Sequence, residues 1–172
     1  HGIPIFATSI ALERAGEIVA GVIYNPVMDE LYTAERGRGA FLNDRRLRVA
    51  GRTELHEMVF GTGLPFIGSG DHGRTLRELR YIMPEVAGIR RCGAAALDLA
   101  WTASGRLDGF WERNLNSWDI AAGLLMVREA GGFVSDLQGK NKMLESGDEV
   151  VGNEDAHKYL LQLLKKAATP AQ

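Results

Sequence analysis

One carboxylate stands out in this sequence of 172 residues because of where it lies. Asp119 follows Trp118 at the start of a long apolar run, residues 120–127, and a glycine pair at 131–132 closes that run. The run has almost no polar face, so we expect residues 117–132 to form a helix that is buried nearly all round. A charge beside such a helix must be capped, paired or bound to a cation, because a bare buried charge is very costly.

Two explanations of Asp119 are open from residue spacing. Acidic residues are common in the first turn of a helix, where they complement the positive end of the helix dipole. Asn116 or Ser117 would cap the start of this helix. Alternatively, the carboxylate is a metal ligand at a phosphate site, and the small residues at 121–123 leave room beside it for a ligand.

Composition and charge exclude several classes of partner. Hydrophobic residues make up 45% of the chain and charged residues 24%, which are ordinary globular values that suit one domain. The formal net charge of −2 gives no electrostatic basis for binding nucleic acid or an anionic membrane. No apolar run approaches the length of a membrane span. The single cysteine, Cys92, excludes an internal disulfide and suits a reducing cytoplasm.

Other polar and aromatic side chains have structural explanations. The arginines between residues 36 and 48 are expected to form a solvated face or an interface, and Glu129 to bind a backbone group or a neighbouring arginine. The three tryptophans are predicted to lie in the core. The four histidines lack the spacing of zinc ligands.

The predicted elements occur in an order that indicates a layered fold. Several strands fill residues 1–49, and a further strand covers residues 58–62. Strands and helices then alternate, with helices predicted at 74–86, 93–105, 117–132 and 157–168, and with a strand at 107–111 that ends at Glu112. That order favours sheets covered by helices, in an α/β or α+β layered fold.

The residues around Asp119 also resemble a known signature. Trp118-Asp119, Ala122-Gly123 and the run 129–132 (EAGG) are similar to the second signature of the inositol monophosphatase family. The segments 93–96 and 108–112 and the opening residues 1–4 resemble the same family, so the resemblance covers essentially the whole chain.

The resemblance implies a layered αβαβα sandwich of the sugar-phosphatase superfamily, with its N-terminal layers incomplete in this chain. Residues 1–50 would be the remaining strands of the first, antiparallel sheet, and residues 51–172 the C-terminal αβα half, within one compact domain. The family's first signature, D-P-x-D-G-T, and the other metal ligands would lie upstream of His1. Since the sequence does not begin with Met, we expect it to be part of a longer protein and to be inactive when expressed alone.

The resemblance further implies a hydrolase that uses Mg²⁺ to cleave a phosphomonoester, with myo-inositol monophosphate as the expected substrate. Asp119 would be the catalytic metal ligand and would contact the substrate. Glu112 would accept a hydrogen bond from a hydroxyl of the polyol, and the backbone at Gly93, Ala94 and Ala95 would reach other ring hydroxyls. Many family members have a hydroxyl side chain at the position of Ala94, which weakens the argument for a side-chain contact there.

Several alternatives stay open within the resemblance. The substrate would instead be fructose 1,6-bisphosphate, histidinol phosphate or a 3′-phosphoadenosine nucleotide, or the fold would serve a regulatory role by binding RNA or protein. The expected partners are a small phosphate ester and a second copy of the chain in a homodimer, without membrane or nucleic acid, in the cytoplasm.

Overall fold

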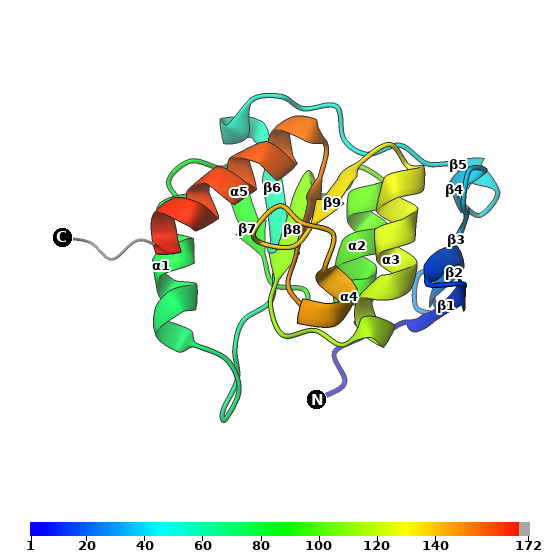
Figure 1. Cartoon of the computed structure of the whole chain (residues 1–172), viewed down its shortest axis with the longest axis horizontal. Helices are drawn as coiled ribbons and strands as arrows, with labels where there is room; N and C mark the ends of the chain where they lie inside the picture. The colour runs from blue at the N-terminus through cyan, green and yellow to red at the C-terminus, as the bar shows by residue number, and fades with distance from the viewer. Residues whose placement is uncertain (169–172) are drawn as a thin grey trace.

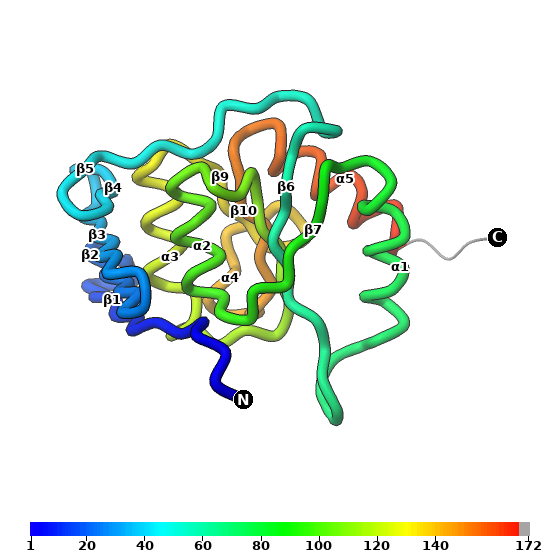
Figure 2. Tube along the Cα trace, turned by 180° about the vertical axis from the view of Figure 1, so that it is seen from behind, coloured from blue at the N-terminus to red at the C-terminus, as the bar shows by residue number. Residues whose placement is uncertain are grey.

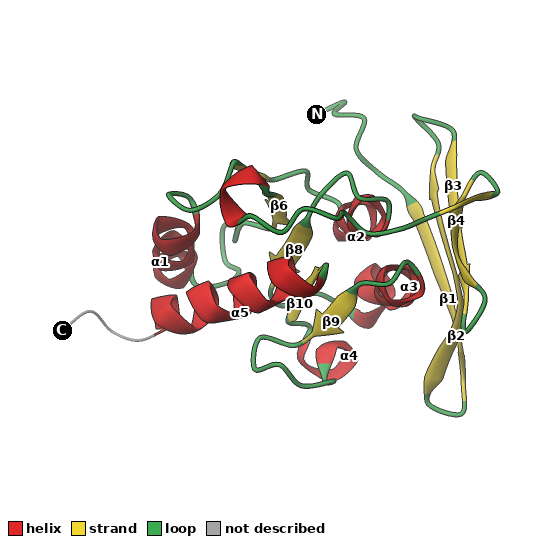
Figure 3. Cartoon of the chain, turned by 90° about the horizontal axis from the view of Figure 1, so that it is seen from above, coloured by secondary structure: helices red, strands yellow, loops and turns green. Residues whose placement is uncertain are grey.

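The computed structural model describes residues 1–168, which form four layers that Figure 3 shows from above. A first sheet is followed by helices α2 (Ala95–Ala103) and α3 (Ser117–Glu129), then by a second sheet, and finally by helices α1 (His72–Ile82) and α5 (Glu154–Ala168). The last four residues of the predicted C-terminal half, 169–172, lie outside the described residues. The predicted layered α/β class is therefore confirmed, in the order β, α, β, α.

The first sheet is a five-stranded antiparallel meander in chain order, as predicted for residues 1–49. Its strands are β1 (Thr8–Arg14), β2 (Glu17–Asn25), β3 (Glu30–Glu35), β4 (Gly39–Leu42) and β5 (Arg45–Arg46). One face packs on α3, where the Gly21 backbone lies so close to Ala122 that a Cβ at Gly21 would sit 3.0 Å from the Ala122 Cα. The other face carries exposed apolar side chains, among them Ile10 and Leu12, and residues 1–168 form no helical layer over it.

The second sheet has the order β7-β6-β8-β10-β9 and is mixed. Its strands are β6 (Val59–Thr62), β7 (Gly88–Arg90), β8 (Gly109–Glu112), β9 (Phe133–Ser135) and β10 (Glu149–Gly152). Strand β6 runs parallel to β7 and β8, whereas β10 is antiparallel to β8 and β9. Two short helices join the elements, η1 (Leu55–Glu57) and α4 (Met143–Ser146), and the sequence pattern did not predict α4.

Helix α3 lies between the two sheets and is buried as predicted, from Ile120 through Val127. Asn116 is its N-cap, and the helix ends just before Gly131, whose φ of +86° stops further helical turns. Gly123 faces α2, where a Cβ would come within 2.5 Å of the Leu99 side chain. Small residues on α3 therefore let it pack closely against both β2 and α2.

Two sequence predictions about apolar side chains are wrong in part. Trp118 was expected in the core but is 70% exposed, because it stands in the first turn of α3 ahead of the buried run. Trp111 is buried and Trp101 is half-buried against the core, as expected. The apolar stripe predicted for α1 is wrong for Leu76 and Met83, which are exposed, but it is confirmed for Ile82, which is buried, and for Leu79, which packs against the core.

Glu129 joins the end of α3 to the first sheet. Its two carboxylate oxygens accept hydrogen bonds from the backbone N–H groups of Gly37 and Gly39, each at 2.8 Å, which confirms the predicted backbone contact. Nearby, Arg36 pairs with Glu17 at 2.7 Å on a solvent-exposed face, in line with the expectation for this arginine group.

Replacing Glu129 with alanine is expected to destabilise the protein by about 1–3 kcal/mol, because two N–H groups lose a charged acceptor. Urea unfolding followed by circular dichroism would measure this loss. Replacement of the exposed Glu13 with alanine serves as the matched control, and equal unfolding midpoints for both variants would contradict the bridging role of Glu129.

The two ends of the described chain lie far apart. The first residues run along the edge of the molecule below α2 and α3, whereas the end of α5 lies at the opposite side, next to α1 (Figures 1 and 2). None of the helices within residues 1–168 combines the length and apolarity needed to cross a bilayer.

Candidate active site

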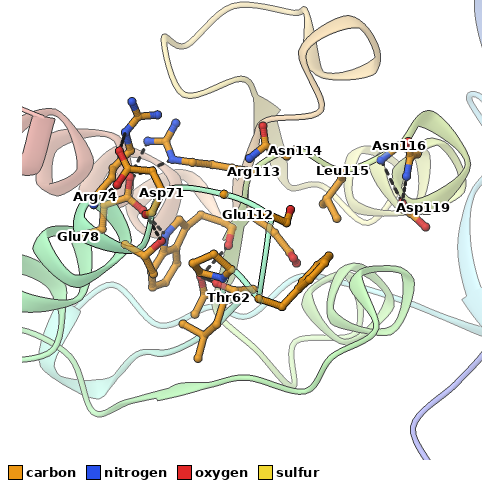
Figure 4. A pocket seen from close by; sticks show the side chains of 18 residues that line it. Thr62, Asp71, Arg74, Glu78, Glu112, Arg113, Asn114, Leu115, Asn116 and Asp119 are labelled. Atoms are coloured by element: carbon orange, nitrogen blue, oxygen red, sulfur yellow. Dashed lines mark hydrogen bonds and ion pairs between the residues drawn. The ribbon is translucent and has the colours of Figure 1, made fainter.

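Asp119 occupies the first turn of α3, where one of its oxygens serves the helix. Oδ2 accepts hydrogen bonds from the backbone N–H of Asn116 at 3.0 Å and from its Nδ2 at 3.3 Å, and so completes a capping box (Figure 4). Both bonds fall on Oδ2, which leaves Oδ1 available. Asp119 therefore lies in the first turn of α3, as predicted, and its capping bond to Asn116 is a role that the sequence did not indicate. A second role for its other oxygen is compatible with the geometry.

A cavity of about 290 Å³ opens beside Asp119. Its walls come from the end of β6 with the loop that follows, the start of α1, the end of β8 and the loop that leads into α3. Figure 4 shows the Glu112 carboxyl in the middle of this cavity, with Asp119 at one side. Two of the residues predicted from sequence therefore line one cavity.

Glu112 is half-buried at the end of β8. Burial raises the pKa of its carboxyl to about 7, the negative charge of Asp119 raises it further, and Arg91 opposes both effects. Glu112 packs against the backbone of Gly63, where a Cβ would overlap the Glu112 carboxyl at 1.8 Å from Oε1. The glycine after β6 is therefore required for Glu112 to reach its position.

A second cavity, of about 300 Å³, lies on the other side of Asp119. Ala94 and Ala95 line it at the start of α2, together with Ser9 of β1 and Trp118. Gly93, the remaining predicted residue, lines neither cavity and precedes α2 with a φ of +96°. Asp119 belongs to both cavities, so it is the point at which the predicted substrate residues meet.

The far wall of the first cavity contains a charged group that sequence reasoning missed. The Arg113 guanidinium donates a hydrogen bond to Glu78 of α1 at 2.6 Å (Figure 4). It also pairs with Asp148 at 3.3 Å. Asp148 also accepts the backbone N–H of Asn114 at 3.2 Å. These contacts fix the loop between Glu112 and Asp119, but they join residues about 35 positions apart, which no local pattern reveals.

Two further acids lie buried beneath Glu112. Asp98 of α2 is 1% exposed, and one of its carboxyl oxygens has no hydrogen-bond partner among the described residues. Burial raises the pKa of Asp98 to about 7 and that of the neighbouring Cys92 thiol to about 11. Glu149 of β10 is fully buried. In the sequence, the signal for Asp98 was an acid inside an otherwise apolar run, whereas Glu149 follows the polar residues Ser146 and Asp148 and has no such signal.

Substituting Asp98 with asparagine is expected to change how stability depends on pH. Because the folded-state pKa of Asp98 is raised to about 7, its contribution is present below the unfolded pKa near 4 and is lost as pH rises through 7. The wild-type protein should therefore lose roughly 2–4 kcal/mol more than Asp98→Asn between pH 4 and pH 8. Urea unfolding of both proteins in metal-free buffer measures the difference, and parallel pH profiles would refute it.

Within residues 1–168, no three side chains of the His, Cys, Asp and Glu types come together as a metal-binding group. Asp119 lines both cavities, and its Oδ1 is not used by the helix cap. Carboxylate oxygen is the ligand type that Mg²⁺ prefers, and Mg²⁺ is usually held by one or two carboxylates with water and substrate phosphate completing its shell. The residues present therefore fit one protein contact to such an ion.

Comparison with known proteins identifies the family of this chain. The profile of the inositol monophosphatase family matches residues 1–169. The chain belongs to the inositol monophosphatase family. The family resemblance that the residues around Trp118 and Asp119 indicated is thereby confirmed, and the match covers nearly the whole chain.

Several members of the inositol monophosphatase family are closely similar in sequence to this chain. The inositol-1-monophosphatase of Mesorhizobium japonicum is 65% identical over 166 residues, which cover 96% of this chain and 62% of that protein. The crystal structure of extragenic suppressor protein suhB from Bartonella henselae is 60% identical and superposes with a TM-score of 0.93, over 96% of this chain and 65% of that one. The Nus factor SuhB of Pseudomonas aeruginosa is 47% identical over 173 residues, which cover 99% of this chain and 64% of that protein. The chain thus spans just under two thirds of the length of these relatives.

Proposed function

We propose that the protein hydrolyses a phosphomonoester with the help of Mg²⁺, and that myo-inositol monophosphate is its substrate. The observation that carries the proposal is the position of Asp119, which lines both the cavity of Glu112 and the cavity of Ala94 and Ala95 and has one carboxylate oxygen outside the capping bonds. Membership of the inositol monophosphatase family and a relative at 65% identity named inositol-1-monophosphatase support the same reaction.

Asp119 would hold the cation through Oδ1 while Oδ2 stays bound to Asn116. When bound, Mg²⁺ supplies charge neutralisation at the phosphoryl oxygens and an activated water. No three metal-ligating side chains meet within residues 1–168. That these residues alone are inactive is part of the proposal, and phosphate release by the isolated segment would test it.

The chain's own residues would orient the polyol. Glu112 accepts a hydrogen bond from a substrate hydroxyl, and Gly63 keeps the space beside Glu112 free of a side chain. The first N–H groups of α2, at Ala95 and Ala96, have no partner within the helix and are suited to bind substrate oxygens. A substrate held at Asp119 would therefore bind the Glu112 carboxylate on one side and the backbone N–H groups of α2 on the other.

A substrate panel on the intact protein tests the proposal. Phosphate release with Mg²⁺ should be fastest, by kcat/KM, for myo-inositol monophosphate, and slower for fructose 1,6-bisphosphate, histidinol phosphate and a 3′-phosphoadenosine nucleotide. A different order among these esters would change the substrate, and no turnover of any phosphomonoester would reject the hydrolase.

A second function is favoured by one observation, the 47% identity to a protein named Nus factor SuhB. We propose as the alternative that the same fold binds RNA or protein in a regulatory role. The exposed arginines near Arg36 are the chain's feature that would serve it. RNA binding that weakens steeply with salt would favour this role. The homodimer and the cytoplasmic location also belong to the proposal, and light scattering of the intact protein would test the dimer.

A further inference from the structure

Glu149 is a buried acid that the proposed reaction leaves without a role. Its side chain is 0% exposed, and neither carboxyl oxygen accepts a hydrogen bond from any of the described residues. A bare carboxylate in such a place is very costly, whereas an apolar residue would fit the strand without cost. The side chain therefore needs an explanation beyond packing.

The sheet places Glu149 directly under the candidate substrate residue. Glu149 begins β10 and is paired in antiparallel register with Glu112 at the end of β8. Paired residues point to the same face of a sheet, with Cβ atoms about 4.5–5.5 Å apart. That face is the one toward α2 and α3, because Phe110 and Val151, two residues along each strand, belong to the core cluster that contains both helices.

Every charge that acts on Glu149 is negative. Burial raises the pKa of Glu149 well above its usual value, and Glu112, Asp98 and Asp119 raise it further. These three acids come from β8, α2 and α3, the elements that surround Glu149 on this face. Arg91 acts on Glu112 and Asp98 but not on Glu149. Burial and these negative charges therefore favour the neutral form of Glu149, which would have one O–H group to donate.

The segment that carries Glu149 is also tied to the loop of the site. The carbonyl oxygen of Gly147 accepts a hydrogen bond from the backbone N–H of Leu115 at 2.8 Å. Asp148 Oδ1 accepts one from the backbone N–H of Asn114 at 3.2 Å. The start of β10 is thus held against the connection between Glu112 and Asp119. A change of the side chain at position 149 is therefore expected to alter the position of Glu112, because these hydrogen bonds restrict the backbone near both residues.

We propose that Glu149 is a positioning residue that, as a neutral carboxylic acid, donates a hydrogen bond to the Glu112 carboxylate. The bond would hold one carboxylate oxygen of Glu112 against β10. The other oxygen would then accept a hydrogen bond from a hydroxyl of the polyol. This role rests on the proposed function, because it concerns the grip on the alcohol part of the phosphate ester.

Two substitutions at Glu149 in the intact protein separate this role from packing. Glu149→Gln keeps a donor of the same shape, and KM for myo-inositol monophosphate should stay within about threefold of wild type, since the amide replaces the O–H group. Glu149→Met keeps the volume without the donor, and KM should rise about tenfold, the effect of one hydrogen bond to a charged group, with kcat within about threefold. The melting temperature of the Met variant should not rise, because the substitution removes the hydrogen bond from Glu149 to Glu112.

Two outcomes of the kinetic test would overturn the proposal. One is a Met variant with the KM of wild type and a raised melting temperature. That result would show that Glu149 destabilises the core and does not position Glu112. The other is a Gln variant that behaves like the Met variant. With p-nitrophenyl phosphate, which has no polyol hydroxyls, all three proteins should have similar KM values.

A readout without substrate separates failure of this inference from failure of the proposed function. The infrared difference spectrum of wild type minus Glu149→Gln at neutral pH, with Mg²⁺ present, should show the C=O stretch of a protonated carboxyl. Presence of that band supports the neutral acid even if no phosphomonoester is turned over, and its absence overturns the inference even if the hydrolase is active.

Discussion

Replacing Asp119 with asparagine should lower kcat/KM for myo-inositol monophosphate by about 10³-fold, the size of effect expected when a group that supports transition-state charge is lost. The asparagine carbonyl can still accept the Asn116 N–H, so the helix cap persists while the negative charge disappears. The Mg²⁺ concentration for half-maximal activity should rise together with the loss of turnover. Phosphate release measured across a Mg²⁺ series follows both quantities.

The control for this variant is Asp155→Asn, the same change in the first turn of α5. Activity of the control should equal that of wild type, and the urea midpoint of Asp119→Asn should stay close to the wild-type value. If Asp119→Asn kept full activity and an unchanged Mg²⁺ dependence, Asp119 would serve α3 only as a capping residue.

Glu112→Gln is expected to raise KM for myo-inositol monophosphate by about 10- to 100-fold, because a hydrogen bond to a charged acceptor is exchanged for one to a neutral amide. The side chain keeps its size, so its close packing against Gly63 is retained. The effect should exceed that of the Glu149 variants, because Glu112 would touch the substrate itself. Initial rates over a range of substrate concentrations separate KM from kcat.

An ester without polyol hydroxyls provides the control for Glu112. With p-nitrophenyl phosphate, Glu112→Gln should have the kinetics of wild type, since no hydroxyl contact is lost. Equal losses with both esters would show that Glu112 supports the reaction or the fold in general, and would argue against hydroxyl recognition.

The elements that carry Asp119 were predictable because their signals are local. The buried run of α3, its cap at Asn116 and the stop near Gly131 all lie within about 16 residues of one another. Trp118 shows the limit of this reasoning, because an aromatic residue beside a buried run was expected in the core and is exposed. Burial depends on which side of the first turn faces the sheets, and that is set by tertiary packing.

The surroundings of the site were not predictable for a related reason. Glu112 and Glu149 meet through the register of β8 and β10, and Arg113 meets Glu78 although one helix and two strands, α2, β7 and β8, separate them in the sequence. Such pairs depend on how distant segments assemble, so neither periodicity nor spacing along the chain indicates them. The roles of Asp119, Glu112, Gly93, Ala94 and Ala95 toward metal and substrate stay predictions, which the variants above test.

The position of α3 between the two sheets has a consequence for inactivation by heat. Its buried residues share one core cluster with Ile23 and Tyr32 of the first sheet and with Phe110 and Val151 of the second. Loosening either sheet would remove packing from the helix that carries Asp119, so catalytic competence and the integrity of the whole fold should be lost in a single cooperative step.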